Sequence, residues 1–270
     1  MRLIIQKDYG DLSQWAANYI VAKIRKANPS ENKPFVLGLP TGSTPIKVYE
    51  ALVEHYKAGR VSFKHVVTFN MDEYVGLGHD HLQSYHYFMH HYLFDHIDIQ
   101  KDNIHILDGT TKDAAAECAA YEEAIKKAGG IDLFLGGAGV NGHLAFNEPG
   151  SSPNSRTRKV RLTESTMQAN SRFFENDMSK VPAEALTVGV GTVLDAKEVI
   201  ILIGGANKAQ TLRKMVEGAV SQSCPITAVQ LHPDSIVVCD REAVSELRVK
   251  TYDYFRFVEK ENLDPESQLG

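Results

Sequence analysis

Cysteine is scarce in this sequence of 270 residues, which contains only Cys118, Cys224 and Cys239. The three cysteines are odd in number and far apart in the sequence, and none belongs to a CxxC pair. This usage argues against a disulfide framework of the kind that stabilises small secreted proteins. We therefore expect reduced thiols and a cytoplasmic location.

Long apolar runs and an excess of one charge are also lacking. No stretch approaches the roughly 20 apolar residues that cross a bilayer, and the start MRLIIQKDYG has no cationic segment followed by an apolar run. We therefore expect neither a membrane span nor a secretory leader. Lys and Arg number 29 against 34 Asp and Glu, a net charge of −5, so nothing points to nucleic acid or an anionic membrane as partner. Any site for an anionic ligand must be built locally.

Short aliphatic runs alternate with amphipathic stretches over most of the chain. This pattern is typical of βα units around a mainly parallel sheet, and it predicts an α/β fold. Several runs are almost wholly apolar, as expected of strands that are covered on both faces. The predicted strands span residues 3–5, 35–39, 66–69, 104–107, 131–136, 186–190, 199–203 and 236–239.

Two amphipathic helices are predicted near the start of the chain. Between the first two strands, apolar residues recur at three- and four-residue steps from Leu12 to Ile24, which indicates a helix buried along one side. A second helix opens at Pro45, whose fixed φ suits the first helical position. Both helices follow strands, as a βα order requires.

No feature of the sequence divides the chain into parts. Hydrophobic residues make up 43% and charged residues 23%, as in an ordinary globular protein. There is no Pro-, Gly- or Ser-rich linker and no internal repeat, so we predict one domain over residues 1–270. Residues 150–182 form the one long stretch without a clear strand. They are polar and rich in Ser and Arg, and we interpret them as a lid or a partner-contacting segment.

Three unusual segments follow predicted strands directly. They are residues 40–44 (PTGST), residues 70–74 (NMDEY) and residues 137–143 (GAGVNGH). In open α/β sheets, ligands bind in the crevice outside the carboxyl ends of the strands. The convergence of three such segments at one edge is a stronger indication of a site than any of them alone.

The turn at residues 41–44 is small and rich in hydroxyl groups, and it leads into a predicted helix. Exposed amides and the positive end of the helix dipole favour an anion there, and a phosphate is the usual occupant. A simple N-cap is an equally good interpretation of the turn taken alone, since Ser and Thr are common at helix starts. The turn is not a Walker A loop, because no GKS or GKT follows.

Acid–base groups stand in the other two segments. Asp72 and Glu73 follow an apolar strand, where burial can raise the basicity of a carboxylate, although two solvated turn acids are the commoner case. His143 lies in a Gly-rich turn between two potential orienting partners, Asn141 and Glu148. A catalytic histidine needs such a partner to hold its tautomer, so this segment favours catalysis over a structural role.

The sequence predicts no nucleotide cofactor and no metal. Residues 137–142 match GxGxxG, but a polar, proline-interrupted stretch follows where a continuous helix would be expected. Tyr, Phe and Met residues interleave at helical spacing with a histidine-rich stretch that has no HExxH motif, which favours a partly solvated helix. Its histidines are His79, His81, His86, His90, His91 and His96.

Over nearly its whole length, the chain resembles the glucosamine-6-phosphate deaminase family. The resemblance is carried, in the family's order, by LGLPTGSTP, FNMDEYVGL, NGHLAFNEPGSS, SRTR, NSRFF, ALTVGVGTVLDA and LHPDSIVVCD. It implies a Rossmann-like three-layer α/β sandwich, usually assembled as a homohexamer and without a cofactor. It also implies a hydrolase of amino-sugar catabolism, which converts glucosamine 6-phosphate to fructose 6-phosphate and ammonia.

The resemblance also implies roles for individual residues. Asp72 is similar to the family's base, which moves a proton between carbons 1 and 2 of the sugar. His143 is similar to the acid–base group that opens the sugar ring, and Glu148 to the carboxylate that orients it. The positions that hold the substrate phosphate match Thr41, Gly42, Ser43, Thr44, Arg172 and Lys208.

The chain departs from the family pattern in two places. Asn141 stands where many members carry Asp, so it can orient His143 but cannot supply a negative charge. Some hexameric members are activated by N-acetylglucosamine 6-phosphate, and Val160 stands where such members carry Lys. The residues that match this allosteric site, or flank Val160 in it, are Ser151, Ser152, Arg158, Arg161 and Tyr254.

Two other functions remain open at this point. A sugar-phosphate lactonase of the same fold would call for an SLFP-like continuation after the Gly-His pair, whereas this chain continues LAFNEP. A non-enzymatic sugar-phosphate sensor would keep the pocket, and Asn141 is the feature that points to it. Such sensors usually carry a basic helix-turn-helix, which nothing in the sequence resembles.

Overall fold

Seven parallel strands form the main sheet of the computed structural model, which describes residues 1–269. Their order is β1-β10-β9-β6-β2-β3-β5, and each neighbouring pair is parallel. Most of their residues are fully buried, which is why the strands stand out as apolar runs in the sequence. The strands span Arg2–Ile5 (β1), Phe35–Leu39 (β2), Val66–Asn70 (β3), Ile104–His105 (β5), Leu133–Gly137 (β6), Val199–Ile203 (β9) and Ser235–Cys239 (β10).

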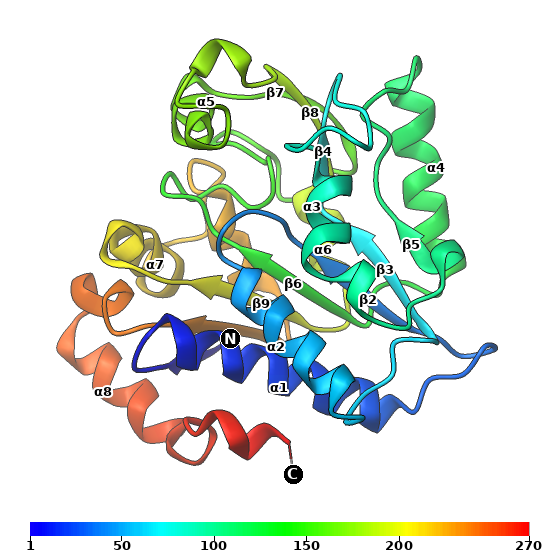
Figure 1. Cartoon of the computed structure of the whole chain (residues 1–270). Helices are drawn as coiled ribbons and strands as arrows, with labels where there is room; N and C mark the ends of the chain where they lie inside the picture. Colours follow the sequence, from blue (N-terminus) through cyan, green and yellow to red (C-terminus); the bar gives the residue numbers. More distant parts are fainter. Residues whose placement is uncertain (270) are drawn as a thin grey trace.

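Helices cover both faces of this sheet, as Figure 1 shows. One buried apolar cluster joins α1, α2 and α3 to alternate strand residues, and a second joins α4, α6 and α7 to the opposite set. The layers are therefore helix, sheet and helix, and the expected α/β sandwich is confirmed. The helices span Tyr9–Ala27 (α1), Ile46–Lys57 (α2), Tyr85–Tyr92 (α3), Ala114–Lys127 (α4), Glu164–Asn170 (α5), Val190–Leu194 (α6), Ala209–Glu217 (α7) and Val249–Val258 (α8).

Helix α1 illustrates how local sequence sets an element's ends. It begins after Asp8, whose carboxylate accepts hydrogen bonds from the amides of Gly10 and Asp11. It ends at Asn28, which adopts a left-handed conformation with φ of 45°. The periodic apolar residues predicted for this helix, from Leu12 to Ile24, are all buried.

The order of the strands reverses direction between β2 and β6. The chain runs from β2 outward to β3 and β5, then returns to β6 and runs the other way to β9 and β10. Such a switch point leaves a crevice at the carboxyl ends of the two adjoining strands, where ligands bind in open α/β sheets. In this protein the adjoining strands are β2 and β6, which are followed by residues 40–44 and residues 138–143.

A second, three-stranded antiparallel sheet lies beyond that edge, at the top of Figure 1. Its order is β4 (Asp72–Tyr74), β8 (Glu184–Thr187) and β7 (Arg158–Arg161). Three expectations are corrected here. The acids at 72–73 lie in a strand rather than a turn, residues 150–182 do contain a strand, and the run 186–190 ends its strand at Thr187, because Val190 already begins α6.

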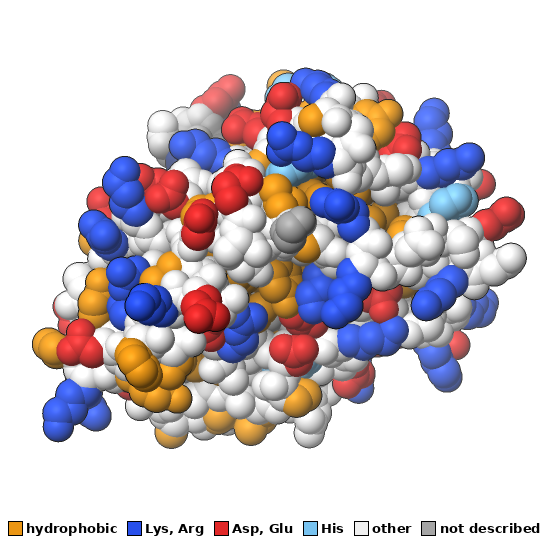
Figure 2. Space-filling view, turned by 90° about the horizontal axis from the view of Figure 1, so that it is seen from below, with side chains coloured by type: hydrophobic (Ala, Val, Ile, Leu, Met, Phe, Trp, Pro, Cys, Tyr) orange, Lys and Arg blue, Asp and Glu red, His pale blue; other side chains and the backbone are white. Residues whose placement is uncertain are grey.

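The surface carries charges of both signs. On the face shown in Figure 2, Lys and Arg side chains are interspersed with Asp and Glu side chains, in keeping with the net charge of −5. Within residues 1–269, no helix is both long enough and apolar enough to cross a membrane. Cys118, Cys224 and Cys239 are buried and free, as expected.

Candidate active site

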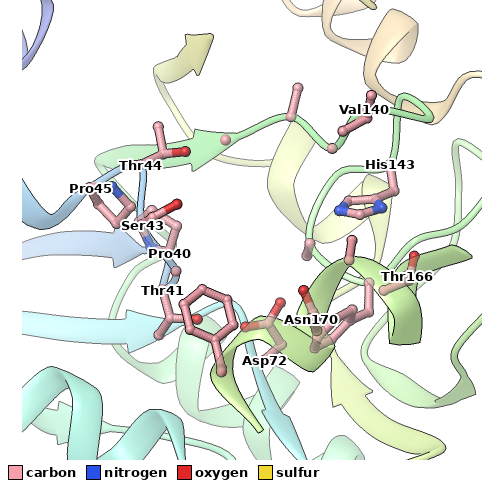
Figure 3. Close-up of a pocket in the computed structure, with 18 of the residues that line it drawn as sticks. Pro40, Thr41, Ser43, Thr44, Pro45, Asp72, Val140, His143, Thr166 and Asn170 are labelled. Carbon is pink, nitrogen blue, oxygen red and sulfur yellow. The ribbon is translucent and has the colours of Figure 1, made fainter. Parts of the chain in front are cut away.

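A cavity of about 650 Å³ opens at the switch point between β2 and β6. Its wall is formed by the segments that follow β2, β3, β6, β9 and β10, together with part of the segment 150–182. Figure 3 shows Thr41, Ser43 and Thr44 on one side of this cavity, His143 facing it from the opposite side and Asp72 between them. The three segments singled out in the sequence therefore meet at one site.

The turn at residues 41–44 presents its hydroxyl groups and backbone to the cavity. Gly42 has φ of +88°, a conformation that residues with a side chain rarely adopt. Within the described residues, no side chain caps the first turn of α2, whose N-cap is Pro45. The N-cap interpretation of Ser43 and Thr44 is therefore wrong, and the unfilled start of α2 favours an anion.

Two cations reach this turn from different parts of the chain. The Nζ of Lys208 lies 3.4 Å from the Thr44 hydroxyl, and the Nη2 of Arg172 lies 3.4 Å from the Ser43 hydroxyl. Burial lowers the pKa of Lys208, and the nearby Arg172 charge lowers it further. Since the two positive charges repel each other, an anion bound between them would relieve this repulsion.

Asp72 is 6% exposed and lines the cavity where the two sheets meet. Burial, and after it the neighbouring charge of Glu73, raises the pKa of Asp72 to about 8. A carboxylate with so high a pKa is a far stronger base than a solvated one. The interpretation of Asp72 and Glu73 as solvated turn acids is wrong.

His143 faces the cavity from the loop that follows β6. The loop is bent into uncommon backbone conformations at Gly142 (φ +84°) and Ala145 (φ +52°). On the side away from the cavity, the imidazole Nδ1 is buried 3.7 Å from the Glu148 carboxylate, too far for a hydrogen bond. The opposite edge of the ring therefore points to the cavity, and the Glu148 carboxylate lies behind the ring.

Glu148 is held by a set of donors. The Asn141 amide donates to Oε2 at 2.7 Å, and the hydroxyl groups of Thr163 and Thr166 donate to Oε1. Burial alone would raise the pKa of Glu148, but the His143 ring and the hydrogen bonds from Thr166 and Asn141 outweigh it and lower the pKa to about 2. Glu148 is therefore a fixed negative charge behind the imidazole.

Asn141 orients the loop differently from the expectation. Its Oδ1 accepts a hydrogen bond from the backbone amide of His143 at 3.1 Å rather than from the imidazole. Its Nδ2 donates to Glu148, a contact that a carboxylate at position 141 could not make. The amide thus links the backbone of the histidine to the carboxylate that stands behind the ring.

Four of the five residues that match or flank the family's allosteric site lie together. A second cavity of about 420 Å³ is lined by Ser151, Ser152, Arg158 and Arg161, with Glu148 also in its wall. Arg158 donates to the Ser151 hydroxyl at 3.2 Å, and burial lowers the pKa of its guanidinium. Tyr254 does not line this cavity. It lies on α8 and is 60% exposed.

Several residues of the site escaped the sequence analysis. The Tyr9 hydroxyl lies 2.9 Å and 2.8 Å from the carbonyl oxygens of Ser43 and Thr44, and it holds the turn at residues 41–44. The Asp240 carboxylate accepts hydrogen bonds from the amide of Gly205, in the loop that leads to Lys208. Asp240 directly follows a strand, so the signal that singled out Asp72 would have found it. Tyr9 carries no comparable local signal.

The histidine-rich stretch folds as expected, into α3 and its flanking loops. The ring of His86 stacks on those of His79 and His90, with centroids 4.1 Å and 4.5 Å apart. Across residues 1–269, no group of three His, Cys, Asp or Glu side chains is arranged to hold a metal ion.

A family model described as glucosamine-6-phosphate isomerases/6-phosphogluconolactonase matches residues 7–238. The chain belongs to this family. It is 62% identical over 263 residues to a protein of Porphyromonas gingivalis named glucosamine-6-phosphate deaminase, covering 97% of this chain and 100% of that relative. It is 59% identical over 259 residues to a protein of the same name from Pasteurella multocida, covering 96% and 97%. The resemblance to the deaminases is confirmed.

Solved structures of the family share the fold. A structure described as a monomeric glucosamine-6-phosphate deaminase superimposes with a TM-score of 0.84 at 42% identity, covering 92% of this chain and all of that one. A 6-phosphogluconolactonase from Trypanosoma cruzi superimposes with a TM-score of 0.73 at 22% identity, covering 91% and 96%. The similarity to the lactonase extends to the fold alone.

Proposed function

We propose that this protein converts glucosamine 6-phosphate to fructose 6-phosphate and ammonia. The observation that carries the proposal is the meeting of three groups at one cavity, namely a hydroxyl-rich turn with two cations beside it, a buried carboxylate of raised pKa and an imidazole backed by a carboxylate. An enzyme that isomerises and deaminates a phosphorylated amino sugar needs these groups. Relatives about 60% identical over the whole chain bear the deaminase name.

The phosphate of the substrate binds at the turn formed by residues 41–44. Lys208 and Arg172 supply charge, and the hydroxyl groups of the turn supply donors. The phosphate is remote from the reacting carbons, so its binding energy fixes the position of the sugar relative to Asp72 and His143.

His143 opens the sugar ring. Ring opening requires a proton to reach the ring oxygen and another to leave the anomeric hydroxyl, and an imidazole can do both in turn. Glu148 and Asn141 hold the ring and its backbone in place. The fixed charge of Glu148 also stabilises the imidazolium when His143 carries the extra proton.

Asp72 then moves a proton within the open chain. It removes the proton from carbon 2, the electron pair of that bond forms a double bond to carbon 1, and the π pair of the carbonyl group at carbon 1 moves to its oxygen, which takes up a proton. The proton held by Asp72 then returns at carbon 1, while the lone pair of the nitrogen forms a protonated imine at carbon 2. Water adds to the imine carbon, the carbon–nitrogen bond breaks, and ammonia leaves. One water is consumed for each ammonia released, and the product is the ketose phosphate.

An ammonia-release assay with glucosamine 6-phosphate tests this proposal. We expect turnover by the purified protein and loss of most of it in Asp72→Asn, with phosphate-dependent binding of the substrate largely retained. Normal turnover in that variant would refute the assignment of the base. Tight binding of the substrate without turnover would favour the sensor, and release of acid from 6-phosphogluconolactone would favour the lactonase.

Residues 150–182 act as a lid over the substrate. This segment contributes Thr166, which donates to Glu148, Asn170, which donates to the Tyr74 hydroxyl at 2.9 Å, and Arg172 at the phosphate turn. Each contact joins the segment to a different wall of the cavity. Protection of the segment from proteolysis by saturating substrate, absent with glucose, is the expected signature.

The second cavity is suited to an anionic effector such as N-acetylglucosamine 6-phosphate. Arg158 and Arg161 supply charge there, Ser151 and Ser152 supply hydroxyl groups, and Glu148 lies in the wall between this cavity and His143. Adding the effector at subsaturating substrate should raise the rate of ammonia release. Unchanged kinetics with a bound effector would show that the cavity is not regulatory.

Three further features are proposed, the first two on the sequence and the third on the resemblance. They are a single domain over residues 1–270, a cytoplasmic location and assembly as a homohexamer. One similar solved structure is described as monomeric, so the family holds more than one assembly state. Light scattering of the purified protein separates a species near six times 29.9 kDa from a monomer.

A further inference from the structure

Glu73 adjoins the proposed base but points away from it. Successive side chains of a strand face opposite sides, and β4 follows this rule. Asp72 and Tyr74 line the cavity, whereas Glu73 is absent from its wall and is 1% exposed. Glu73 therefore cannot touch a substrate in that cavity.

Backbone amides surround the Glu73 carboxylate. Its Oε1 accepts hydrogen bonds from the amides of Tyr74 at 2.8 Å and Tyr85 at 3.0 Å, and its Oε2 accepts one from His86 at 2.9 Å. Tyr85 and His86 are the first two residues of α3, so these are amides that the helix itself leaves without a partner. The positive end of the helix adds to their effect.

Gly109 packs against the Glu73 side chain from another side. A Cβ atom at this position would lie 3.2 Å from the Glu73 Cγ and 2.0 Å from the Tyr74 carbonyl oxygen. The backbone around residue 109 thus packs directly on the glutamate, and a larger residue could not. Water is kept from a carboxyl group that three amides contact.

This arrangement favours the charged form of Glu73 over that of Asp72. Three amide donors point at its two oxygens, and a proton on either oxygen would compete with one of them. Asp72 has no such donors in its hydrogen bonding among the described residues. As pH rises, Glu73 therefore loses its proton first, and Asp72 must ionise beside a charge already present.

We propose that Glu73 is a positioning residue that holds a negative charge behind Asp72 and thereby makes Asp72 a stronger base. The proposal rests on the function proposed for Asp72. Glu73 acts through Asp72 and makes no contact with the sugar.

The other groups around the pair do not supply this charge. Tyr49, Tyr74, Tyr85 and Tyr121 surround Asp72, but burial raises the pKa of each hydroxyl, so they stay neutral. Burial raises the pKa of Glu73 to about 7, the three amides limit this rise, and the charge of Asp108 adds to it, so the value stays below the value of about 8 for Asp72. Burial also lowers the pKa of His86, whose backbone amide donates to Glu73. Across the cavity, His143 is paired with Glu148.

The test is the pH dependence of kcat/KM for ammonia release by the Glu73→Gln variant. Substitution removes the charge, so the acid limb should move to lower pH by on the order of one unit. The plateau rate should fall a few-fold, because a weaker base transfers the proton less readily. Ionisations of the substrate are common to both enzymes, so the difference between their profiles belongs to the protein.

Ser84→Ala is the matched control. Ser84 is the N-cap of α3, and its hydroxyl accepts a hydrogen bond from the Tyr87 amide at 3.0 Å. The control therefore weakens the same helix start without changing charge. We expect its acid limb to coincide with that of the wild type. An acid limb that is unmoved in Glu73→Gln, or moved equally in both variants, would mean that Glu73 only holds the helix.

A second measurement covers the case in which Glu73→Gln does not fold. The carboxyl groups of Glu73 and Asp72 are followed by ¹³C NMR in the wild type, where Glu73 should lose its proton at a lower pH than Asp72. Loss of the proton from Asp72 before Glu73 would overturn the proposal. If Asp72→Asn is inactive and the limb of Glu73→Gln is unmoved, this inference alone fails. If Asp72→Asn turns over normally, the proposed base fails as well.

Discussion

Substituting Lys208 by Met should weaken binding of the substrate through its phosphate alone. Methionine keeps most of the apolar stem and removes the charge that lies 3.4 Å from the Thr44 hydroxyl. Arg172 remains at the other end of the turn, by the Ser43 hydroxyl. The variant therefore keeps one of two cations and the whole of the turn.

The size of the effect follows from the burial of the site. A hydrogen bond to a charged group contributes about 1.5–3 kcal/mol, and a buried pair of opposite charges lies toward the upper end of that range. A loss of about 2–3 kcal/mol corresponds to a rise in KM of about 30- to 150-fold, since about 1.4 kcal/mol is tenfold. Asp72 and His143 are untouched, so kcat should change by less than the rise in KM.

The assay compares two substrates. Ammonia release is measured with glucosamine 6-phosphate and with glucosamine, which lacks the phosphate, for the wild type and for Lys208→Met. The rise in KM should appear with glucosamine 6-phosphate and be absent with glucosamine. The apparent Kd for inorganic phosphate, measured as competitive inhibition, should rise by a similar factor.

The wild type supplies an independent check through pH. Burial and Arg172 lower the pKa of Lys208 in the empty site, so the cation is lost at a lower pH than in a solvated lysine. The KM for glucosamine 6-phosphate should therefore rise toward alkaline pH, and Lys208→Met should remove this rise. An equal rise in KM with both substrates would refute the assignment of Lys208 to the phosphate, because it would place Lys208 near the reacting carbons.

Three further predictions test the site and the core. Gly139→Ala should lower kcat at least tenfold, because a Cβ there would lie 2.3 Å from the His143 ring, whereas Gly137→Ala, whose Cβ finds its nearest neighbour at 3.9 Å, should change kcat far less. Glu148→Gln should reduce the loss of unfolding free energy at acid pH, as measured by urea unfolding. The pKa of Glu148 in the folded protein, about 2, lies below the ordinary value of 4.5. Its contribution to stability, roughly 2 kcal/mol with partial exposure allowed for, is therefore present above pH 4.5 and lost as pH falls toward 2. Trp15→Ala should lower the free energy of unfolding by about 3–5 kcal/mol, since Trp15 is fully buried and its indole donates to the Asn262 carbonyl at 2.7 Å.

The main sheet could be predicted from the sequence because its strands are covered on both faces. Every residue of β9, Val199–Ile203, is buried, and an apolar run of this length has few other interpretations. Strand β7 could not be found in this way. Its residues, Arg158–Arg161, alternate between half-buried and exposed at the edge of a small sheet, so three of the four are charged.

Strand β4 was missed for a different reason. Asp72 and Glu73 are buried, but a pattern of apolar residues cannot reveal buried acids. Their burial depends on groups that are distant in sequence, including Gly109 and the start of α3. The position of the acids at the end of a strand was sufficient to single them out, whereas their surroundings required the fold.

The contacts around Glu148 show the same limit. Asn141 lies seven residues before it and could be proposed from the sequence as a partner of the loop. Thr166, which donates to the same carboxylate, lies 18 residues after it, on α5. No local pattern links the two, because the contact exists only when the segment 150–182 folds back over the cavity.

The junction of the two sheets explains why the base can be both buried and fixed. Met71 joins β3 to β4, and its amide donates to the Leu39 carbonyl at 3.0 Å while its carbonyl accepts from the Val188 amide at 2.8 Å. Asp72 therefore follows a residue that is hydrogen-bonded to both sheets, and it cannot move without disturbing one of them. Arg172 and Thr166, by contrast, belong to the segment that encloses the cavity. The protein thus places the proposed base next to a backbone that is hydrogen-bonded on both sides and the enclosing groups on a separate segment, a division suited to the proposed reaction, in which a sugar phosphate must enter and carbon 2 must then be held against a carboxylate.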